Sequence, residues 1–138
     1  MKTGCDAPDP DATPILMTLT ATQCFGSCPA YSVRVHESGQ MAWCGTAYVK
    51  VRGSAFSTLD KAHLDDLRGA FTASGFEGLT SPERSCTDTP TMTLAYGGHE
   101  THDAFCSREP QALHRLEERV QDLLGVRRWI GPEDERTP

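Results

Sequence analysis

Hydrophobic side chains change their spacing along this chain in an order that few folds can accommodate. Apolar and polar residues alternate in six segments, the pattern of strands that bury one face and expose the other. These segments are residues 15–21, 31–37, 41–44, 48–52, 91–96 and 99–106. After the fourth segment, and again after the sixth, apolar residues recur every three or four positions, which predicts two helices.

Turn and cap residues divide this pattern into elements. Gly39 and the pair Gly97–Gly98 predict hairpin turns, because glycine adopts the positive φ that such turns require. The first helix is expected over 58 to about 74 with Ser57 as its N-cap, and the second over 110–125. The order β-β-β-β-α-β-β-α predicts an α+β fold: a mostly antiparallel sheet with both helices packed on one face.

The chain is expected to form one domain with a tether at each end. Residues 1–14 contain three prolines and three aspartates and few apolar side chains, so we expect a flexible N-terminal tether. Residues 132–138 are charged and end in proline, which predicts a flexible C-terminal tail. The single α+β domain is expected over 15–131.

Composition argues against a nucleic-acid partner and against a transmembrane segment. The chain has 138 residues, with 13 Lys and Arg against 19 Asp and Glu, so its net charge is −6. Nucleic-acid-binding modules usually carry a basic excess, and we therefore expect no nucleic-acid partner. Apolar runs are only a few residues long, so no transmembrane segment is expected. The partner is expected to be an unknown protein or small molecule.

Six cysteines are many for a reduced cytosolic protein and favour an extracytoplasmic location, with the cytoplasm left open. Cys24 and Cys28 lie on a short turn and are expected to form a structural disulfide, worth about 2 kcal/mol. Cys86 and Cys106 flank the later hairpin, and their bond would contribute about 3 kcal/mol. Cys44 would then be left over as a small buried hydrophobic side chain.

Cys5 has two alternative interpretations. The acylated cysteine of a bacterial lipoprotein typically follows a small residue and precedes a flexible polar tether, as Cys5 follows Gly4 here. Four residues precede Cys5, so this anchor requires a leader that was removed. The alternative is that Cys5 is a stray thiol.

The most distinctive segment lies between the first two expected strands. Its motif Cys-Phe-Gly-x-Cys-Pro-x-Tyr is made by Cys24, Phe25, Gly26, Cys28, Pro29 and Tyr31. In this motif the chain resembles a bacterial family, the domain of unknown function 6438. The resemblance covers about residues 15–131; it continues through Gly39, Trp43–Gly45, Thr87-Asp88-Thr89-Pro90 and Trp129-Ile130-Gly131. It implies a secreted or lipid-anchored protein and supplies no activity.

Chemistry at the cysteines remains the alternative to a structural role. Seven side chains could ligate a metal: Cys24, Cys28, His36, Cys86, His99, His102 and Cys106. No two of these cysteines have the Cys-x-x-Cys spacing that is usual at zinc sites. A redox pair usually has that same spacing at a helix N-terminus, whereas Cys28 leads into a strand. We therefore expect no metal and no cofactor.

Catalytic signatures are also missing from the sequence. Asp88 suits an Asx turn better than a general acid. Arg127 and Arg128 beside Trp129 could hold a phosphate or stack on a base, but an ordinary surface role is expected. The resulting hypothesis is a non-enzymatic binding or interaction module, possibly tethered to a membrane. The alternative is a thiol-redox or metal-binding protein that uses Cys24, Cys28, Cys86 and Cys106, with an enzyme of ordinary type as the third interpretation.

Overall fold

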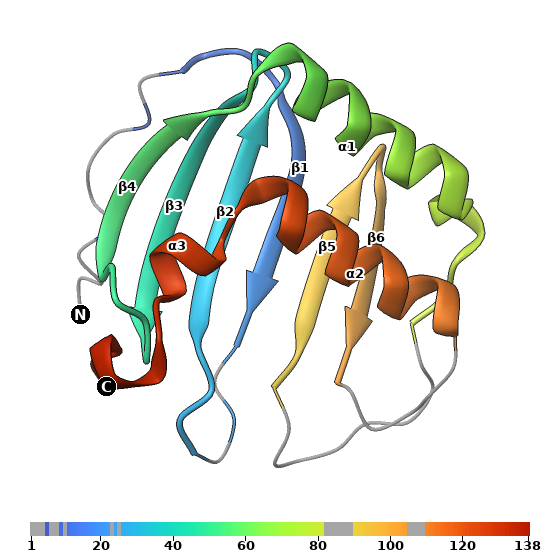
Figure 1. The fold of residues 1–138 in the computed structure, drawn as a ribbon. Coiled ribbons are helices and arrows are strands. Elements are labelled where there is room, and N and C mark those ends of the chain that lie inside the picture. Colours follow the sequence, from blue (N-terminus) through green and yellow to red (C-terminus); the bar gives the residue numbers. More distant parts are fainter. Residues whose placement is uncertain are drawn as a thin grey trace.

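Six antiparallel strands form one sheet, and helices α1 and α2 cover the same face of it (Figure 1). The computed structural model describes residues 5, 9, 11–22, 24, 26–81, 90–104 and 110–138. The strands are β1 (Ile15–Ala21), β2 (Ala30–His36), β3 (Gln40–Ala47), β4 (Gly53–Thr58), β5 (Met92–Tyr96) and β6 (His99–Asp103). The helices are α1 (Lys61–Ser74), α2 (Gln111–Leu124) and α3 (Arg127–Ile130), with 3-10 turns η1 (Phe76–Gly78) and η2 (Glu133–Glu135). The sheet order is β4-β3-β2-β1-β5-β6, so the expected α+β fold with an antiparallel sheet is confirmed.

Alternation along the strands gives the sheet two different faces. Leu19 of β1 pairs with Val33 of β2, and both side chains are completely buried beneath the helices. The adjacent pair, Thr20 and Ser32, points to the opposite side because successive side chains alternate across a strand. We call this opposite side the open face; it carries small polar residues, among them Thr18, Thr20, Ser32, Cys44 and Thr93.

The two long helices bury the stripes that their sequences predict. α2 contributes Leu113, Leu116, Val120, Leu123 and Leu124 to the core. α1 contributes Leu67 and Phe71 and begins later than expected, at Lys61. Its N-cap is Asp60, whose carboxylate accepts a hydrogen bond from the backbone N–H of His63 at 2.7 Å. The expectation that Ser57 caps this helix is wrong, because Ser57 belongs to β4 and pairs with Met41.

The alternating segment 48–52 is not a strand of the sheet, which corrects the sequence prediction. Its backbone bonds to the C-terminal part of the chain instead: Lys50 N–H donates to the Ile130 carbonyl at 2.8 Å, and Val51 N–H to Trp129 at 3.0 Å. Val49 is fully buried, as the alternation of apolar and polar residues predicts. The alternation does not indicate which part of the chain bonds to the backbone of this segment. The fourth strand is formed by 53–58.

The described residues at both ends, where the sequence predicts flexible tethers, form bonds with the domain. Cys5 is bonded to Cys44 of β3, and Glu37 N–H donates to the Pro14 carbonyl at 2.9 Å. At the other end, Thr137 forms an isolated bridge with Val49. Within the described part of the chain, no helix has the length and apolar character needed to cross a membrane.

Candidate functional site

The loop that connects β1 to β2 carries the most distinctive sequence motif and is closed by a disulfide. Cys24 and Cys28 are bonded with their Cα atoms 5.5 Å apart, which is the pairing that the sequence predicted. The bond fixes the entry into β2. A ring this small stabilises the fold by about 2 kcal/mol through the entropy it removes from the unfolded chain.

The other cysteine assignments have different outcomes. Cys44 was expected to be left over, and this is wrong: it is bonded to Cys5, with Cα atoms 5.7 Å apart. The partner was missed because periodicity says nothing about where a polar segment such as 1–14 lies. Cys86, Cys106, Asp88 and Phe25 lie outside the described residues, so the predicted Cys86–Cys106 bond stays a prediction.

Three aromatic rings in contact explain two of the motif positions. Tyr31 and Trp43 have ring centroids 4.8 Å apart, and Trp43 and Trp129 are 5.1 Å apart. The guanidinium of Arg128 lies 4.1 Å from the Trp129 ring centroid, a cation–π contact. Burial raises the pKa of Tyr31 to about 12. Tyr31 and Trp129 are therefore core residues that tie β2 to α3.

Gly45 and Trp43 hold the segment 48–52 against β3. The indole N–H of Trp43 donates to the Val51 carbonyl at 2.9 Å. A Cβ at Gly45 would collide with that same carbonyl oxygen. A tryptophan followed two residues later by glycine therefore makes room for the returning chain and also binds it.

Three open hollows surround the end of the sheet at which the Cys24–Cys28 loop lies. They measure about 330, 340 and 380 Å³. The first is lined by residues of β1, β2 and β3, including Thr20, Ser32 and Thr46. The second includes Ser27 and Tyr48, and the third Pro29 and Arg127; both also include Arg136. We call the surface formed by Ser27, Pro29, Tyr48, Arg127 and Arg136 the loop end.

Two residues of the loop end have unusual environments. Tyr48 has φ +53°, a left-handed conformation that costs a non-glycine residue free energy. Its N–H donates to the Thr137 carbonyl at 2.6 Å, which fixes the C-terminal segment there. Arg136 donates through Nε to the Gly131 carbonyl at 2.9 Å. Sequence reasoning missed both residues, since neither lies in a motif.

A buried acidic pair lies elsewhere, between β6 and α2. Asp103 is completely buried and Glu117 is 1% exposed. Burial, and then the neighbouring carboxyl of Asp103, raises the pKa of Glu117 to about 10. His114 approaches Asp103 at 3.4 Å. The pair was missed although one signal was present: Glu117 interrupts the apolar stripe of α2 between Leu113 and Val120.

The described histidines lie in separate environments rather than at one centre. His99 bonds through Nε2 to the Leu79 carbonyl at 2.6 Å, and His102 lies 2.9 Å from Glu100. His36 contacts Asp9. Among the residues that the structure describes, no three His, Cys, Asp or Glu side chains form a group suited to a metal ion. Because Cys24 and Cys28 are bonded to each other, the structure weighs against the metal-binding alternative.

Comparison with known families assigns the chain to a group but not to an activity. No curated protein matches the sequence. One family model, Domain of unknown function (DUF6438), matches residues 15–124, which include all six strands and both long helices. The protein therefore belongs to the family of the domain of unknown function DUF6438.

Proposed function

We propose that this protein is a non-enzymatic binding module that recognises an extended peptide segment of a partner protein at the loop end. The observation that carries the proposal is the gathering of three hollows around one loop that is closed by a disulfide. The disulfide, the aromatic stack and the bond from Tyr48 to Thr137 restrict that loop and its neighbours. A surface that is rigid before binding loses less conformational entropy when the partner arrives.

The size and lining of the hollows favour a peptide over an enclosed small molecule. Each hollow lies at the lower end of the range for small-molecule pockets and is open to solvent. Thr20 and Thr46 are among the residues that line one hollow, and Arg136 lines both of the others. An extended chain could place a carboxylate against Arg136 and its backbone along the threonines.

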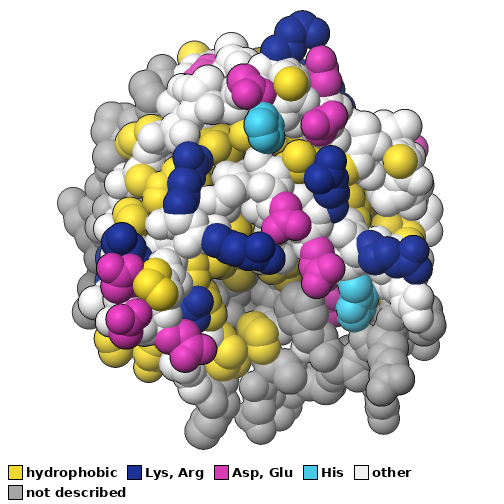
Figure 2. Space-filling model, viewed as in Figure 1, with side chains coloured by type: hydrophobic (Ala, Val, Ile, Leu, Met, Phe, Trp, Pro, Cys, Tyr) yellow, Lys and Arg dark blue, Asp and Glu magenta, His cyan; other side chains and the backbone are white. Residues whose placement is uncertain are grey.

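The surface charge favours recognition of a specific partner over non-specific electrostatic attraction. Figure 2 shows basic and acidic side chains interspersed over the helix-covered side, without a patch of one sign. With a net charge of −6, such a surface gives no broad attraction to a polyanion. We therefore do not propose a nucleic-acid partner.

A hollow-filling variant tests the proposed site. Short random peptides would be selected on the immobilised, oxidised full-length chain, and their dissociation constants measured against two variants. Ser27→Arg places a long side chain into one hollow from an exposed position and should weaken binding about tenfold or more, equivalent to about 1.4 kcal/mol.

Ala62→Arg is the matched control, because Ala62 is exposed on α1 and lines none of the three hollows. It should leave binding unchanged. Peptides that bind equally well to both variants would place the binding surface elsewhere, and a selection that enriches no peptide would contradict the peptide-binding role.

We propose an extracytoplasmic location on the basis of the two disulfides, which persist in oxidising compartments. A lipid thioether at Cys5 would use the same sulfur atom as its bond to Cys44, so the two states exclude each other. Intact mass of the protein from its natural host, before and after reduction, distinguishes them. A lipid-sized mass increase would favour the anchor, and a cross-linked peptide that joins Cys5 to Cys44 in a digest of the unreduced protein would favour the disulfide.

A further inference from the structure

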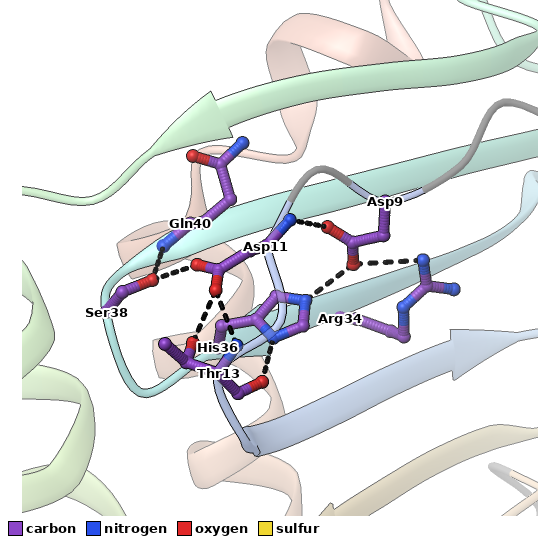
Figure 3. A network of polar contacts seen from close by, with 7 residues as sticks. All are labelled: Asp9, Asp11, Thr13, Arg34, His36, Ser38 and Gln40. Carbon is purple, nitrogen blue, oxygen red and sulfur yellow. Dashed lines mark hydrogen bonds and ion pairs between the residues drawn. The ribbon is translucent and has the colours of Figure 1, made fainter.

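The hairpin between β2 and β3 binds an acidic segment of the same chain (Figure 3). The carboxylate of Asp9 lies 2.5 Å from His36 Nε2 and 3.2 Å from Arg34 Nη2. The hydroxyl of Ser38, in the turn, donates to the carboxylate of Asp11. Two cationic side chains and one hydroxyl of the hairpin thus face two aspartates of the N-terminal segment.

The geometry around His36 identifies its charge state. Nδ1 lies 2.7 Å from the Thr13 carbonyl, and Nε2 lies 2.5 Å from the Asp9 carboxylate. Both partners are acceptors, so both ring nitrogens must donate, which only the imidazolium form can do. Burial alone lowers the pKa of His36, but the bonds to Asp9 and Thr13 outweigh it and raise the pKa above its ordinary value.

The acidic segment is held at both of its ends. Cys5 precedes it and is bonded to Cys44 on the open face of β3. Pro14 follows it and accepts the bond from Glu37 next to β1. Fixing both ends keeps the aspartates at a high effective concentration near Arg34 and His36, and opening the disulfide would release one end.

We propose that Arg34, His36 and Ser38 form a binding site for an aspartate-bearing peptide segment of a partner protein. The chain's own Asp9 and Asp11 fill this site while the Cys5–Cys44 disulfide is closed, and reduction of the disulfide makes it accessible. This site is separate from the loop end, so this proposal does not depend on peptide binding at the loop end.

The chemistry of the site determines the class of ligand. Hydrogen bonds between ionised partners are shorter and stronger than neutral ones, so His36 and Arg34 discriminate a carboxylate from an amide. His36 is 4% exposed in the occupied site, and such burial strengthens its interaction with Asp9. A partner segment needs one carboxylate for Arg34 and His36 and a second acceptor for Ser38, which is the arrangement that Asp9 and Asp11 provide.

Opening the disulfide is a thiol–disulfide exchange with a dithiol reductant. One thiolate of the reductant attacks a sulfur of the Cys5–Cys44 bond and forms a mixed disulfide, which releases one cysteine thiolate. The second thiol of the reductant then displaces the other cysteine. Cys5 and Cys44 end as two thiols after gaining two electrons and two protons, and the reductant becomes a disulfide.

The test uses the full-length chain with its own aspartates neutralised, Asp9→Asn and Asp11→Asn, and adds a synthetic peptide of residues 8–14 in trans. The signals of the His36 ring in NMR spectra report binding, since the acidic peptide would contact that ring directly. Binding is measured with Cys5 intact and with Cys5→Ser, which removes one disulfide and keeps Cys24–Cys28. The unchanged indole signal of Trp43 shows that each variant is folded.

The acidic peptide is expected to shift the His36 signals saturably in the Cys5→Ser background and to bind about tenfold or more weakly when the disulfide is closed. A control peptide with asparagine at both acidic positions should give no saturable shift of the His36 signals. Equal binding of the acidic and the amide peptide, or no saturable binding at all, would overturn the acidic-peptide site. Equal affinity with and without Cys5 would overturn its control by the disulfide.

Discussion

Glu117 is an ionisable residue within an otherwise apolar stripe of the core. It lies on the buried side of α2, where the stripe of apolar residues would otherwise be continuous. Burial and the neighbouring Asp103 raise its pKa to about 10, so the side chain is protonated at neutral pH. A protonated carboxyl can donate its hydrogen to the carboxylate of Asp103, whereas two buried carboxylates would repel each other.

The stability of the protein should therefore fall in alkaline solution. The pKa of Glu117 in the folded state lies above its ordinary value of 4.5, so the native state holds an additional proton between about pH 4.5 and about 10. Its contribution is complete below that window and is lost as the pH rises through it. Glu117→Gln keeps the shape without the titration. One proton over three pH units is worth about 4 kcal/mol, so the free energy of unfolding of the variant should fall by about that much less than that of the wild type between about pH 6 and about pH 9.

Urea unfolding at the two pH values measures this difference. Glu118→Gln is the matched control, because Glu118 is exposed on the adjacent position of α2. The control should follow the wild type. A wild-type curve that is as flat with pH as that of Glu117→Gln would contradict the raised pKa.

At Gly45 one missing methyl group determines how the chain returns over β3. Gly45→Ala would force a Cβ into the Val51 carbonyl, a backbone atom that cannot rotate away, and should destabilise the fold by about 1–3 kcal/mol. Gly69→Ala is the control: its Cβ meets no atom within 4 Å, and alanine in a helix should stabilise by about 0.5–1 kcal/mol. Urea unfolding of both variants measures the difference, and the same sign for both changes would refute the steric argument.

At the scale of elements, the start of α1 shows where local signals were ambiguous. Ser57 and Asp60 are both good N-cap residues, and the sequence favoured the first. The structure uses Asp60, because the backbone of residues 53–58 is extended and pairs with β3. Strand pairing thus competes with helix extension and delays the helix by one turn.

This choice can be tested with two alanine variants. Asp60→Ala removes the acceptor for His63 N–H and should lower the midpoint of urea unfolding measurably. Ser57→Ala should lower it much less, because the structure gives the Ser57 side chain no capping bond to α1. A larger effect at Ser57 would return the helix start to the position that the sequence predicted.

At the scale of the whole molecule, the two disulfides stabilise by different amounts. The Cys5–Cys44 ring spans 39 residues and the Cys24–Cys28 ring spans four. Because the entropy removed from the unfolded chain grows with ring size, the long ring contributes about 4 kcal/mol and the short one about 2 kcal/mol. The structural role of the N-terminal segment is therefore larger than its composition implies.

Cys44→Ser should accordingly cost about twice as much stability as Cys28→Ser in urea unfolding without reductant. Alkylation of the unfolded, unreduced protein followed by peptide mapping should find Cys5, Cys24, Cys28 and Cys44 protected. Modification of Cys5 or Cys44 before reduction would contradict the long ring, and a greater loss at Cys28 would contradict its entropic origin.

The candidate sites were predicted unevenly, and the reason is the distance between their parts in the sequence. The Cys24–Cys28 bond joins residues within one turn, and the local motif indicated it. Arg136 and Tyr48 line one hollow with Ser27 because the C-terminal segment bonds to the backbone of Tyr48 and Val49. The contact of Asp9 with His36 was missed for the same reason, since the composition of 1–14 predicted a tether.

The sequence by itself determined the class of fold and which apolar side chains of β2 and α2 are buried, because the local spacing of apolar residues decides which face can leave water. Only the tertiary structure decided which backbone groups pair with the segment 48–52, where Cys5 finds Cys44, and which residues surround the Cys24–Cys28 loop. The burial of a side chain depends on its position in the local pattern of apolar and polar residues. Hydrogen-bonding partners and disulfides join distant residues, and the packed chain alone selects among the pairs that local chemistry permits.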